Sequence, residues 1–244
     1  MKNLPSNEVY QRLASDKTAV LKTLRDFSNQ KNAVWGVMSR NREQNFALSG
    51  LLGFNLHGKK VGVIGTGKIG QAFCKIMLGF GCEVTAFDLI ANKEMEALGV
   101  SYAPLIEVLG ADIISLHCPL NEQTKHIINA ETLSYCKKGV TIINTGRGGL
   151  LDTKAVIEAL KNGTIGALGL DVYEQEEKLF FKDLSSTIIQ DDIIQRLMSF
   201  SNVLITGHQG FFTKEAMEKI ARTTLENISN LEKNLPLATS NSIV

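Results

Sequence analysis

Short apolar runs rich in β-branched residues alternate with segments of helical spacing along the chain from residue 59 onwards. Strand alternating with helix is typical of a mainly parallel sheet that is covered on both faces. Seven such runs fit a doubly wound α/β sheet. The predicted strands are Val61–Ile64, Glu83–Phe87, Val100–Ala103, Asp112–Leu116, Val140–Asn144, Ala167–Asp171 and Val203–Thr206.

One stretch, Gln175–Asn202, interrupts this alternation and is too long for a simple connection. We therefore expect it to be functional or partly helical, with Asp191–Met198 supplying the helix. Apolar residues at helical spacing predict the other helices, which lie between or after the strands. They are Ile69–Gly79, Lys93–Leu98, Thr153–Leu160 and Lys214–Leu231.

The first 45 residues differ from the rest in charge, because their lysines and arginines exceed their acidic residues by four. The remaining residues carry a net charge of −3. The spacing of Leu13, Val20, Leu24 and Phe27 predicts an amphipathic helix over 6–28. We interpret it as a helix packed on the main domain or on a neighbouring subunit.

The overall composition is that of a soluble globular protein, with 44% apolar and 21% charged residues and a net charge of +1. Such a balance gives no reason to expect nucleic acid as a partner, and no apolar run is long enough for a membrane span. Because no C-x-x-C pair or Cys/His cluster occurs, we expect no metal site, free buried thiols and a cytoplasmic location. The cysteines are Cys74, Cys82, Cys118 and Cys136.

The strongest single motif is Gly65-Thr-Gly-Lys-Ile-Gly70, which follows an apolar strand directly and opens a helix. In a Rossmann fold Gly65 permits the tight turn, Gly67 lets the backbone approach a pyrophosphate, and Gly70 lets the helix pack on the strand. The helix N-terminus then offers N–H groups to the phosphates. This order of strand, turn and helix predicts a dinucleotide site.

An acidic residue, Asp88, ends the next predicted strand, eighteen residues after Gly70. A carboxylate there accepts hydrogen bonds from ribose hydroxyls and repels a 2′-phosphate, so NAD is the expected cofactor rather than NADP. The alternative is a glycine turn followed by a surface aspartate, which the order of the elements disfavours.

Three polar residues follow the ends of late predicted strands, namely Arg147, Glu176 and His208. The ligand crevice of an open parallel sheet lies at the carboxyl ends of its strands. A guanidinium can grip a carboxylate, an imidazole can exchange a proton with a carbonyl oxygen, and a carboxylate can orient that imidazole. Together the three predict reduction of a 2-oxo acid by NADH.

Each of these residues has a structural alternative when it is taken alone. A solvated surface residue also explains Arg147, which lies in a glycine-rich loop, and Glu176, which lies in the acidic run 174–177. His208 alone could cap a strand. Their joint placement favours a shared site. His117, at another strand end, is either a cofactor contact or a packed structural histidine.

These motifs resemble those of the D-2-hydroxyacid dehydrogenase family, and most closely those of its fermentative NAD-dependent D-lactate dehydrogenases. The similarity is continuous from about Ser39 to Leu235. The segments that carry it are Gly65–Gly70, Phe87–Asp88, Ile114–Pro119, Ile143–Gly148, Asp171–Glu176, Gln190–Ile194 and Thr206–Phe211.

The resemblance implies a role for each candidate residue. Arg147 becomes the anchor of the substrate carboxylate, His208 the acid/base and Glu176 its partner. A homodimer is also expected, since family members usually pair through the dinucleotide domain. Besides the three glycines of the turn, the expected cofactor contacts are Lys68, Ile69, Asp88, Cys118, Pro119, Thr145, Gly146 and Asp171.

The resemblance also divides the chain into an NAD-binding domain over 46–210, a C-terminal helix and tail of the substrate lobe over 211–244, and a divergent helical remnant of that lobe over 1–45. In the family the lobe closes over the cofactor and excludes water. Here some 38 residues that match nothing in it stand in its place.

Three hypotheses about function remain open at this point. Retention of Arg147, Glu176 and His208 favours interconversion of pyruvate and D-lactate with NAD. The missing lobe favours an NAD-binding module without turnover, either a truncated remnant or a redox-sensing interaction protein. A dehydrogenase for another 2-hydroxy acid is the third hypothesis, which the lactate-type motifs disfavour.

Overall fold

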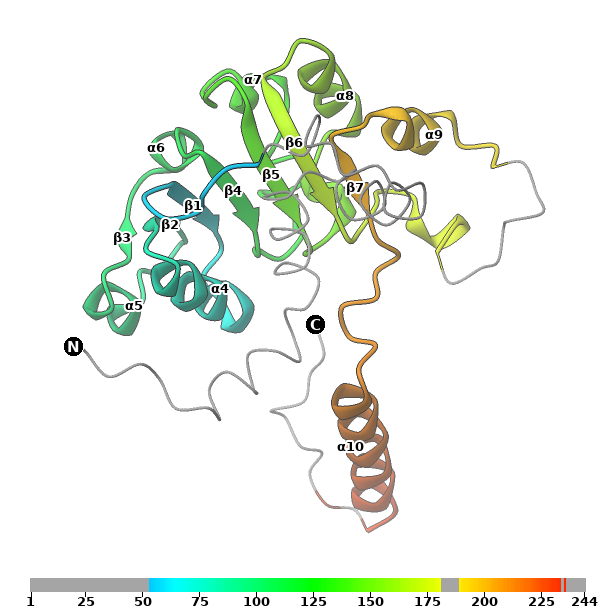
Figure 1. The fold of residues 1–244 in the computed structure, drawn as a ribbon. Helices are drawn as coiled ribbons and strands as arrows, with labels where there is room; N and C mark the ends of the chain where they lie inside the picture. The colour runs from blue at the N-terminus through cyan, green and yellow to red at the C-terminus, as the bar shows by residue number, and fades with distance from the viewer. Residues whose placement is uncertain (1–52, 181–188, 234, 236–244) are drawn as a thin grey trace, which may run out of the picture. The chain divides into compact units, whose positions relative to one another are not determined.

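The computed structural model describes residues 53–180, 189–233 and 235 (Figure 1). The described residues divide between His208 and Gln209 into two compact units. The helix predicted at 6–28, and with it all of 1–45, lies outside the described residues, so that prediction stays untested.

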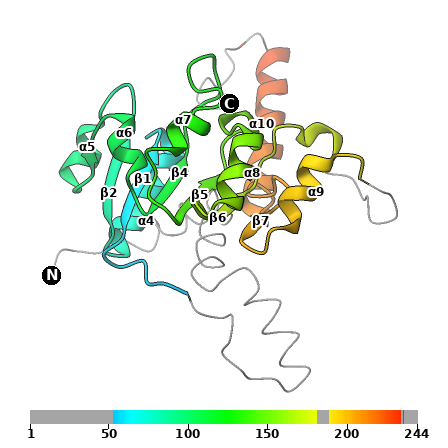
Figure 2. The ribbon, with the colours of Figure 1, turned by 90° about the horizontal axis from the view of Figure 1, so that it is seen from above.

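Seven strands form one sheet in the unit that ends at His208, and all seven predicted strands are present in it. The order is β3-β2-β1-β4-β5-β6-β7, and each neighbouring pair is parallel, which confirms the doubly wound Rossmann-type sheet (Figures 1 and 2). The strands are β1 (Lys60–Ile64), β2 (Glu83–Phe87), β3 (Ser101–Tyr102), β4 (Ile113–Leu116), β5 (Val140–Asn144), β6 (Ile165–Leu170) and β7 (Val203–Ile205).

Helices α4 (Lys68–Gly79), α5 (Lys93–Ala97), α8 (Thr153–Lys161), α9 (Asp192–Ser199) and α10 (Lys214–Glu232) lie where the spacing predicts them. Two further helices, each little more than one turn long, are missing from the prediction. The unpredicted elements are α6 (Leu105–Leu109), α7 (Ala130–Leu133) and the 3₁₀ turns η1 (Gly148–Leu150) and η2 (Glu176–Lys178).

Two buried clusters cover the sheet, because neighbouring residues of a strand point to opposite faces. Val63 of β1 joins Phe73 and Met77 of α4 in one cluster, whereas the next residue, Ile64, joins Val156 of α8 in the other. Burial of each large apolar side chain contributes about 1.5–3 kcal/mol. The helices are therefore held against both faces, and the carboxyl ends of the strands are left to form the site.

The observed strand ends correct two predictions. β6 begins at Ile165, two residues before the predicted start at Ala167. The prediction missed this start because Gly166 interrupts the apolar run in the sequence. A Cβ at Gly166 would lie 2.6 Å from the carbonyl oxygen of Gly139, so only glycine allows the two backbones to approach this closely. β3 has two residues rather than four.

The second unit contributes α10 to the described residues. Thr213 caps this helix, since its hydroxyl accepts a hydrogen bond from the N–H of Ala216 at 3.2 Å. None of the described helices combines the length and apolar character that crossing a membrane requires.

Candidate active site and dinucleotide site

Two glycines of the turn after β1 are required by close backbone contacts. Gly65 has a φ of +93°, and a Cβ there would lie 2.5 Å from the backbone nitrogen of Cys118. A Cβ at Gly70 would lie 2.0 Å from the carbonyl oxygen of Gly65. These contacts bring the first turn of α4 and the residues after β4 against the end of β1.

Gly67 has the opposite surroundings, because a Cβ there would meet no atom within 4 Å. It is the N-cap residue of α4, and no side chain caps the helix. Gly67, Lys68 and Ile69 are exposed, whereas Gly70 is buried. The helix N-terminus therefore presents uncapped N–H groups to an open cradle, which fits the pyrophosphate of a dinucleotide.

Asp88 follows β2 and is tied to the same turn. One of its carboxylate oxygens, Oδ2, accepts hydrogen bonds from the backbone N–H and, at 2.8 Å, the hydroxyl of Thr66. The other, Oδ1, accepts from the N–H of Leu89 at 2.7 Å. Burial raises the pKa of Asp88, but the hydrogen bonds from Thr66, Leu89 and Ile90 outweigh it and hold that pKa below its usual value.

At the end of β4, His117 is packed against α4. Its Nε2 lies 2.8 Å from the hydroxyl of Ser115, and its ring centroid lies 5.1 Å from that of Phe73. These contacts fit a structural role, and a cofactor contact of His117 stays an untested prediction. Cys118 follows His117, and both Cys118 and Cys136 are half-buried rather than buried as expected. Burial together with the charge of Asp88 raises the pKa of the Cys118 thiol to about 11.

The loop after β5, which carries Arg147, is held by a residue that the sequence analysis did not single out. Asn144 is fully buried, and its side chain accepts from the N–H of Gly146 at 3.0 Å and donates to the carbonyl of Arg147 at 2.9 Å. A Cβ at Gly148 would lie 2.1 Å from the carbonyl carbon of Tyr173. The exposed Arg147 therefore projects from a loop fixed at both ends.

Glu176 and His208, which stand far apart in the sequence, are brought together. Nδ1 of His208 lies 3.1 Å from Oε1 of Glu176, while Oε2 of Glu176 accepts from the N–H of Tyr173 at 3.0 Å. Their side chains are 31% and 23% exposed, so the pair is shielded and yet open to a ligand. The carboxylate fixes one ring nitrogen of the imidazole.

The backbone of His208 takes the left-handed conformation, with a φ of +49°. For a residue other than glycine this costs about 1–2 kcal/mol. Asp171 holds this turn, because its carbonyl accepts from the N–H of His208 at 2.8 Å and its carboxylate accepts from the Thr206 hydroxyl. Asp171 is buried, so its described contacts position His208 from the end of β6.

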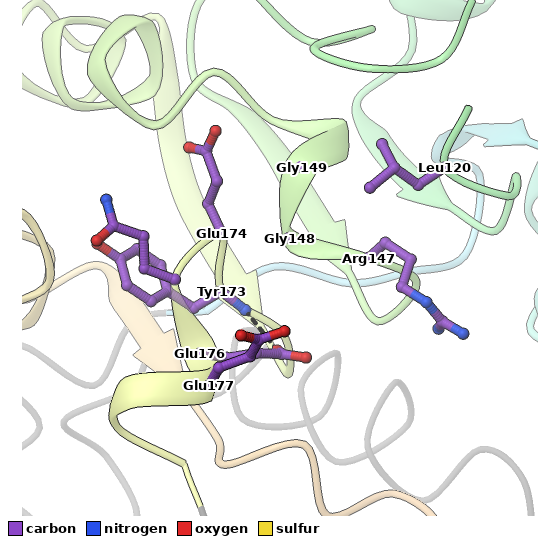
Figure 3. Close-up of a pocket in the computed structure, with 9 residues that line it drawn as sticks. Leu120, Arg147, Gly148, Gly149, Tyr173, Glu174, Glu176 and Glu177 are labelled. Atoms are coloured by element: carbon purple, nitrogen blue, oxygen red, sulfur yellow. Dashed lines mark hydrogen bonds between the residues drawn. The ribbon is translucent and has the colours of Figure 1, made fainter. Parts of the chain in front are cut away.

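A pocket of about 410 Å³ lies between the loops after β5 and β6. Arg147 lies on one side of it and the acidic run on the other, as Figure 3 shows. His208 does not line this pocket but contacts Glu176, which does. The pocket is lined by Leu120, Arg147, Gly148, Gly149, Tyr173, Glu174, Gln175, Glu176 and Glu177.

The acidic run is not uniformly solvated. Glu174 accepts a hydrogen bond from the hydroxyl of Thr153 at 3.1 Å and lies 2.9 Å from Nε2 of His126. The sequence offered no partner for His126, because Glu174 lies 48 residues away. Within the described part of the chain, no cluster of three or more His, Cys, Asp and Glu side chains is arranged to hold a metal ion.

Comparison with known proteins gives one family throughout. The model of the D-isomer specific 2-hydroxyacid dehydrogenases, NAD binding domain, matches residues 18–210, so the similarity begins earlier than the expected start near Ser39. D-lactate dehydrogenase of Escherichia coli is 52% identical over 195 residues, which are 80% of this chain and 59% of that protein. The chain thus spans about 59% of the length of such curated relatives.

Solved structures give the same result. The pyruvate reductase of Chlamydomonas reinhardtii superposes with a TM-score of 0.87 and 40% identity, over 93% of this chain and 68% of that one. D-lactate dehydrogenase from Aquifex aeolicus, complexed with NAD and lactic acid, gives a TM-score of 0.81 and 32% identity, over 91% and 66% of the two chains.

Proposed function

Because this chain belongs to the D-isomer specific 2-hydroxyacid dehydrogenases and carries their NAD-binding domain, we propose that it interconverts pyruvate and D-lactate with NAD. The hydrogen bond between Glu176 and His208, beside a pocket that also presents Arg147, is the observation that carries this proposal. The family acts on 2-oxo and 2-hydroxy acids, and the choice of pyruvate is the finer part of the proposal.

Arg147 binds the substrate carboxylate. A guanidinium forms two parallel hydrogen bonds to a carboxylate and so fixes the plane of the bound acid. Asn144 holds the backbone of Arg147 from within the sheet, which limits how far the guanidinium can drift from the pocket. Good orientation of this kind accounts for a large share of catalysis in bimolecular reactions.

His208 exchanges the proton. With Nδ1 engaged by Glu176, the other ring nitrogen, Nε2, carries the proton that moves to the carbonyl oxygen of the 2-oxo acid. When bound, NADH supplies the hydride that adds to the carbonyl carbon, so the products are the 2-hydroxy acid and NAD⁺. Glu176 holds the tautomer of His208 and stabilises the imidazolium form that the reverse reaction produces.

Two names among the relatives support pyruvate and lactate as the substrate pair. They are the pyruvate reductase of Chlamydomonas and the Aquifex enzyme that was complexed with lactic acid. A small monocarboxylate matches a pocket in which Arg147 is the only basic residue among the lining residues that the structure describes.

The test compares Glu176→Gln with Glu177→Gln, a neighbouring carboxylate that lines the same pocket. We expect the wild-type chain to oxidise NADH with pyruvate and to form D-lactate. Glu176→Gln should lower kcat by about 100-fold or more with little change in KM, since general acid–base catalysis contributes about 10²–10⁴-fold. Equal losses in both variants, or formation of L-lactate, would contradict the proposal.

NAD binding without turnover is the second candidate. The open cradle at Gly67, which fits a dinucleotide whether or not a substrate is turned over, supports it. The two candidates differ in one outcome, since both predict that NADH binds but only the first predicts that a 2-oxo acid consumes it.

A further inference from the structure

The side chain of Tyr102 reaches the dinucleotide turn from the edge of the sheet. β3 pairs with β2 so that Tyr102 stands beside Ala86, and the N–H of Ala103 donates to the carbonyl of Ala86 at 3.0 Å. This register places the Tyr102 hydroxyl 3.0 Å from Oγ1 of Thr66. Thr66 is buried, and its own hydroxyl lies 2.8 Å from Oδ2 of Asp88.

The direction of these hydrogen bonds is fixed by the carboxylate at their end. An ionised aspartate only accepts, so the Thr66 hydroxyl must donate to Asp88. Oγ1 of Thr66 can then only accept from its other neighbour, so the hydroxyl of Tyr102 donates to it. The three side chains form one relay, in which each bond polarises and strengthens the next.

We propose that this relay from Tyr102 through Thr66 positions the Asp88 carboxylate for the ribose of NAD and so contributes to the preference for NAD over NADP. The inference deepens the cofactor side of the proposed function and rests on Asp88 as the ribose acceptor. Thr66 holds Oδ2 through two donors. Oδ1 accepts from the backbone N–H of Leu89, and Leu89 and the following Ile90 are 84% and 81% exposed, so the chain beside this oxygen is open to solvent.

The expected effect follows from what each cofactor can offer to Asp88. A ribose 2′-hydroxyl donates to the carboxylate, and a well-held carboxylate binds it better. A 2′-phosphate has no such hydrogen to donate and is repelled by the charge, whichever way the carboxylate is turned. Loss of the relay therefore weakens NADH binding and leaves NADPH binding nearly unchanged.

The experiment is a titration of the full chain with NADH and with NADPH, read from nicotinamide fluorescence or by calorimetry. Tyr102→Phe removes only the first donor of the relay. Tyr135→Phe is the matched control, because Tyr135 is an exposed tyrosine on another part of the chain. Thr66→Val removes the middle hydroxyl at nearly constant volume, and Thr66→Ser restores it.

We expect Tyr102→Phe to raise the Kd for NADH about two- to tenfold, the range of one net hydrogen bond, and the Kd for NADPH less than twofold. Tyr135→Phe should change neither value. In the Thr66→Val background Tyr102→Phe should have no further effect, because the relay is already broken. Thr66→Ser should keep the wild-type ratio of the two constants.

Two results would overturn the inference. One is an unchanged ratio of the two Kd values in Tyr102→Phe. The other is the same loss from Tyr102→Phe with and without the Thr66 hydroxyl, which would make Tyr102 an independent packing residue. Thermal unfolding of each variant accompanies the titrations. The titrations measure cofactor binding alone. A result that overturns the relay would therefore not contradict the proposed turnover of pyruvate, which is tested separately.

Discussion

We expect Gly67 to be needed for cofactor binding and Gly70 for the stability of the fold, and replacement of each by alanine tests these two roles. A Cβ at Gly67 would meet nothing within 4 Å, whereas one at Gly70 would lie 2.0 Å from the backbone oxygen of Gly65. Gly67 has a φ of −62°, which alanine adopts without strain. The same chemical change therefore acts on an open cradle in one case and on a packed backbone in the other.

For Gly67→Ala the expected change in the free energy of unfolding is within about 1 kcal/mol, because a reduced entropy of the unfolded chain offsets a poorer N-cap. Its methyl group would occupy the space through which the pyrophosphate approaches the N–H groups of α4. Losing one charge-assisted hydrogen bond costs about 1.5–3 kcal/mol. We therefore expect the Kd for NADH to rise at least about tenfold.

For Gly70→Ala the contact must be relieved by moving α4 away from β1. Overpacking of this kind costs about 1–3 kcal/mol, and each kcal/mol lowers Tm by about 2–4 °C in a chain of this size. Calorimetric unfolding and NADH titration of both variants give the test. The reasoning is refuted if Gly67→Ala binds NADH as the wild type does, or if it lowers Tm as much as Gly70→Ala.

His208→Gln should lower kcat for pyruvate reduction by about 100-fold or more, while NADH titration gives the wild-type Kd; lost binding would make His208 structural. Burial raises the pKa of the Cys118 and Cys136 thiols to about 11, so alkylation near neutral pH should be slow and accelerate about tenfold per pH unit up to that value. Bound NADH should slow the alkylation of Cys118, which lies beside the Gly65 turn, but not that of Cys136. Peptide mass spectrometry measures the alkylation of both cysteines, and equal protection of the two would contradict the cofactor site. Partial burial raises the pKa of Asp112, but Lys137 and the backbone N–H of Lys60 bind its carboxylate and lower that pKa below its ordinary value of 3.8. The ionised carboxylate therefore stabilises the folded chain at pH values above 3.8, and this contribution is lost as the pH falls through the lowered pKa. Asp112→Asn should therefore flatten the acid side of the plot of unfolding free energy against pH; a curve as steep as that of the wild type would refute this.

The sheet could be predicted from the sequence because a parallel strand that is buried on both faces has a nearly continuous run of apolar residues. β4 and β5 are buried at every position, and their predicted bounds lie within one residue of the observed ones. Gly166 hid the start of β6, since the reason for that glycine is its contact with Gly139, which only the fold reveals. The helix α5 was predicted, but α6, which is equally short, and the shorter α7 were not, because about one turn holds too few positions to define a period.

The candidate site residues were easier to predict than the residues that position them. Arg147 and His208 stand at strand ends with side chains suited to the chemistry, and the structure brings Glu176 to His208. Asn144 and Thr66 act through hydrogen bonds to backbone and side chains that meet only in the folded chain. No local pattern marks Thr66. For Asn144 there is one signal, since an asparagine stands at a strand end before a glycine-rich loop.

Single turnover tests the central claim most directly, namely that Arg147, Glu176 and His208 form a working site on the NAD-binding domain. The chain is loaded with an equal amount of NADH, binding is verified by titration, and pyruvate is then added while the nicotinamide absorbance is followed. We expect that each bound NADH is consumed once, that D-lactate appears in equal amount, and that His208→Gln stops the reaction. Bound NADH that stays reduced with pyruvate and with other 2-oxo acids would contradict the account.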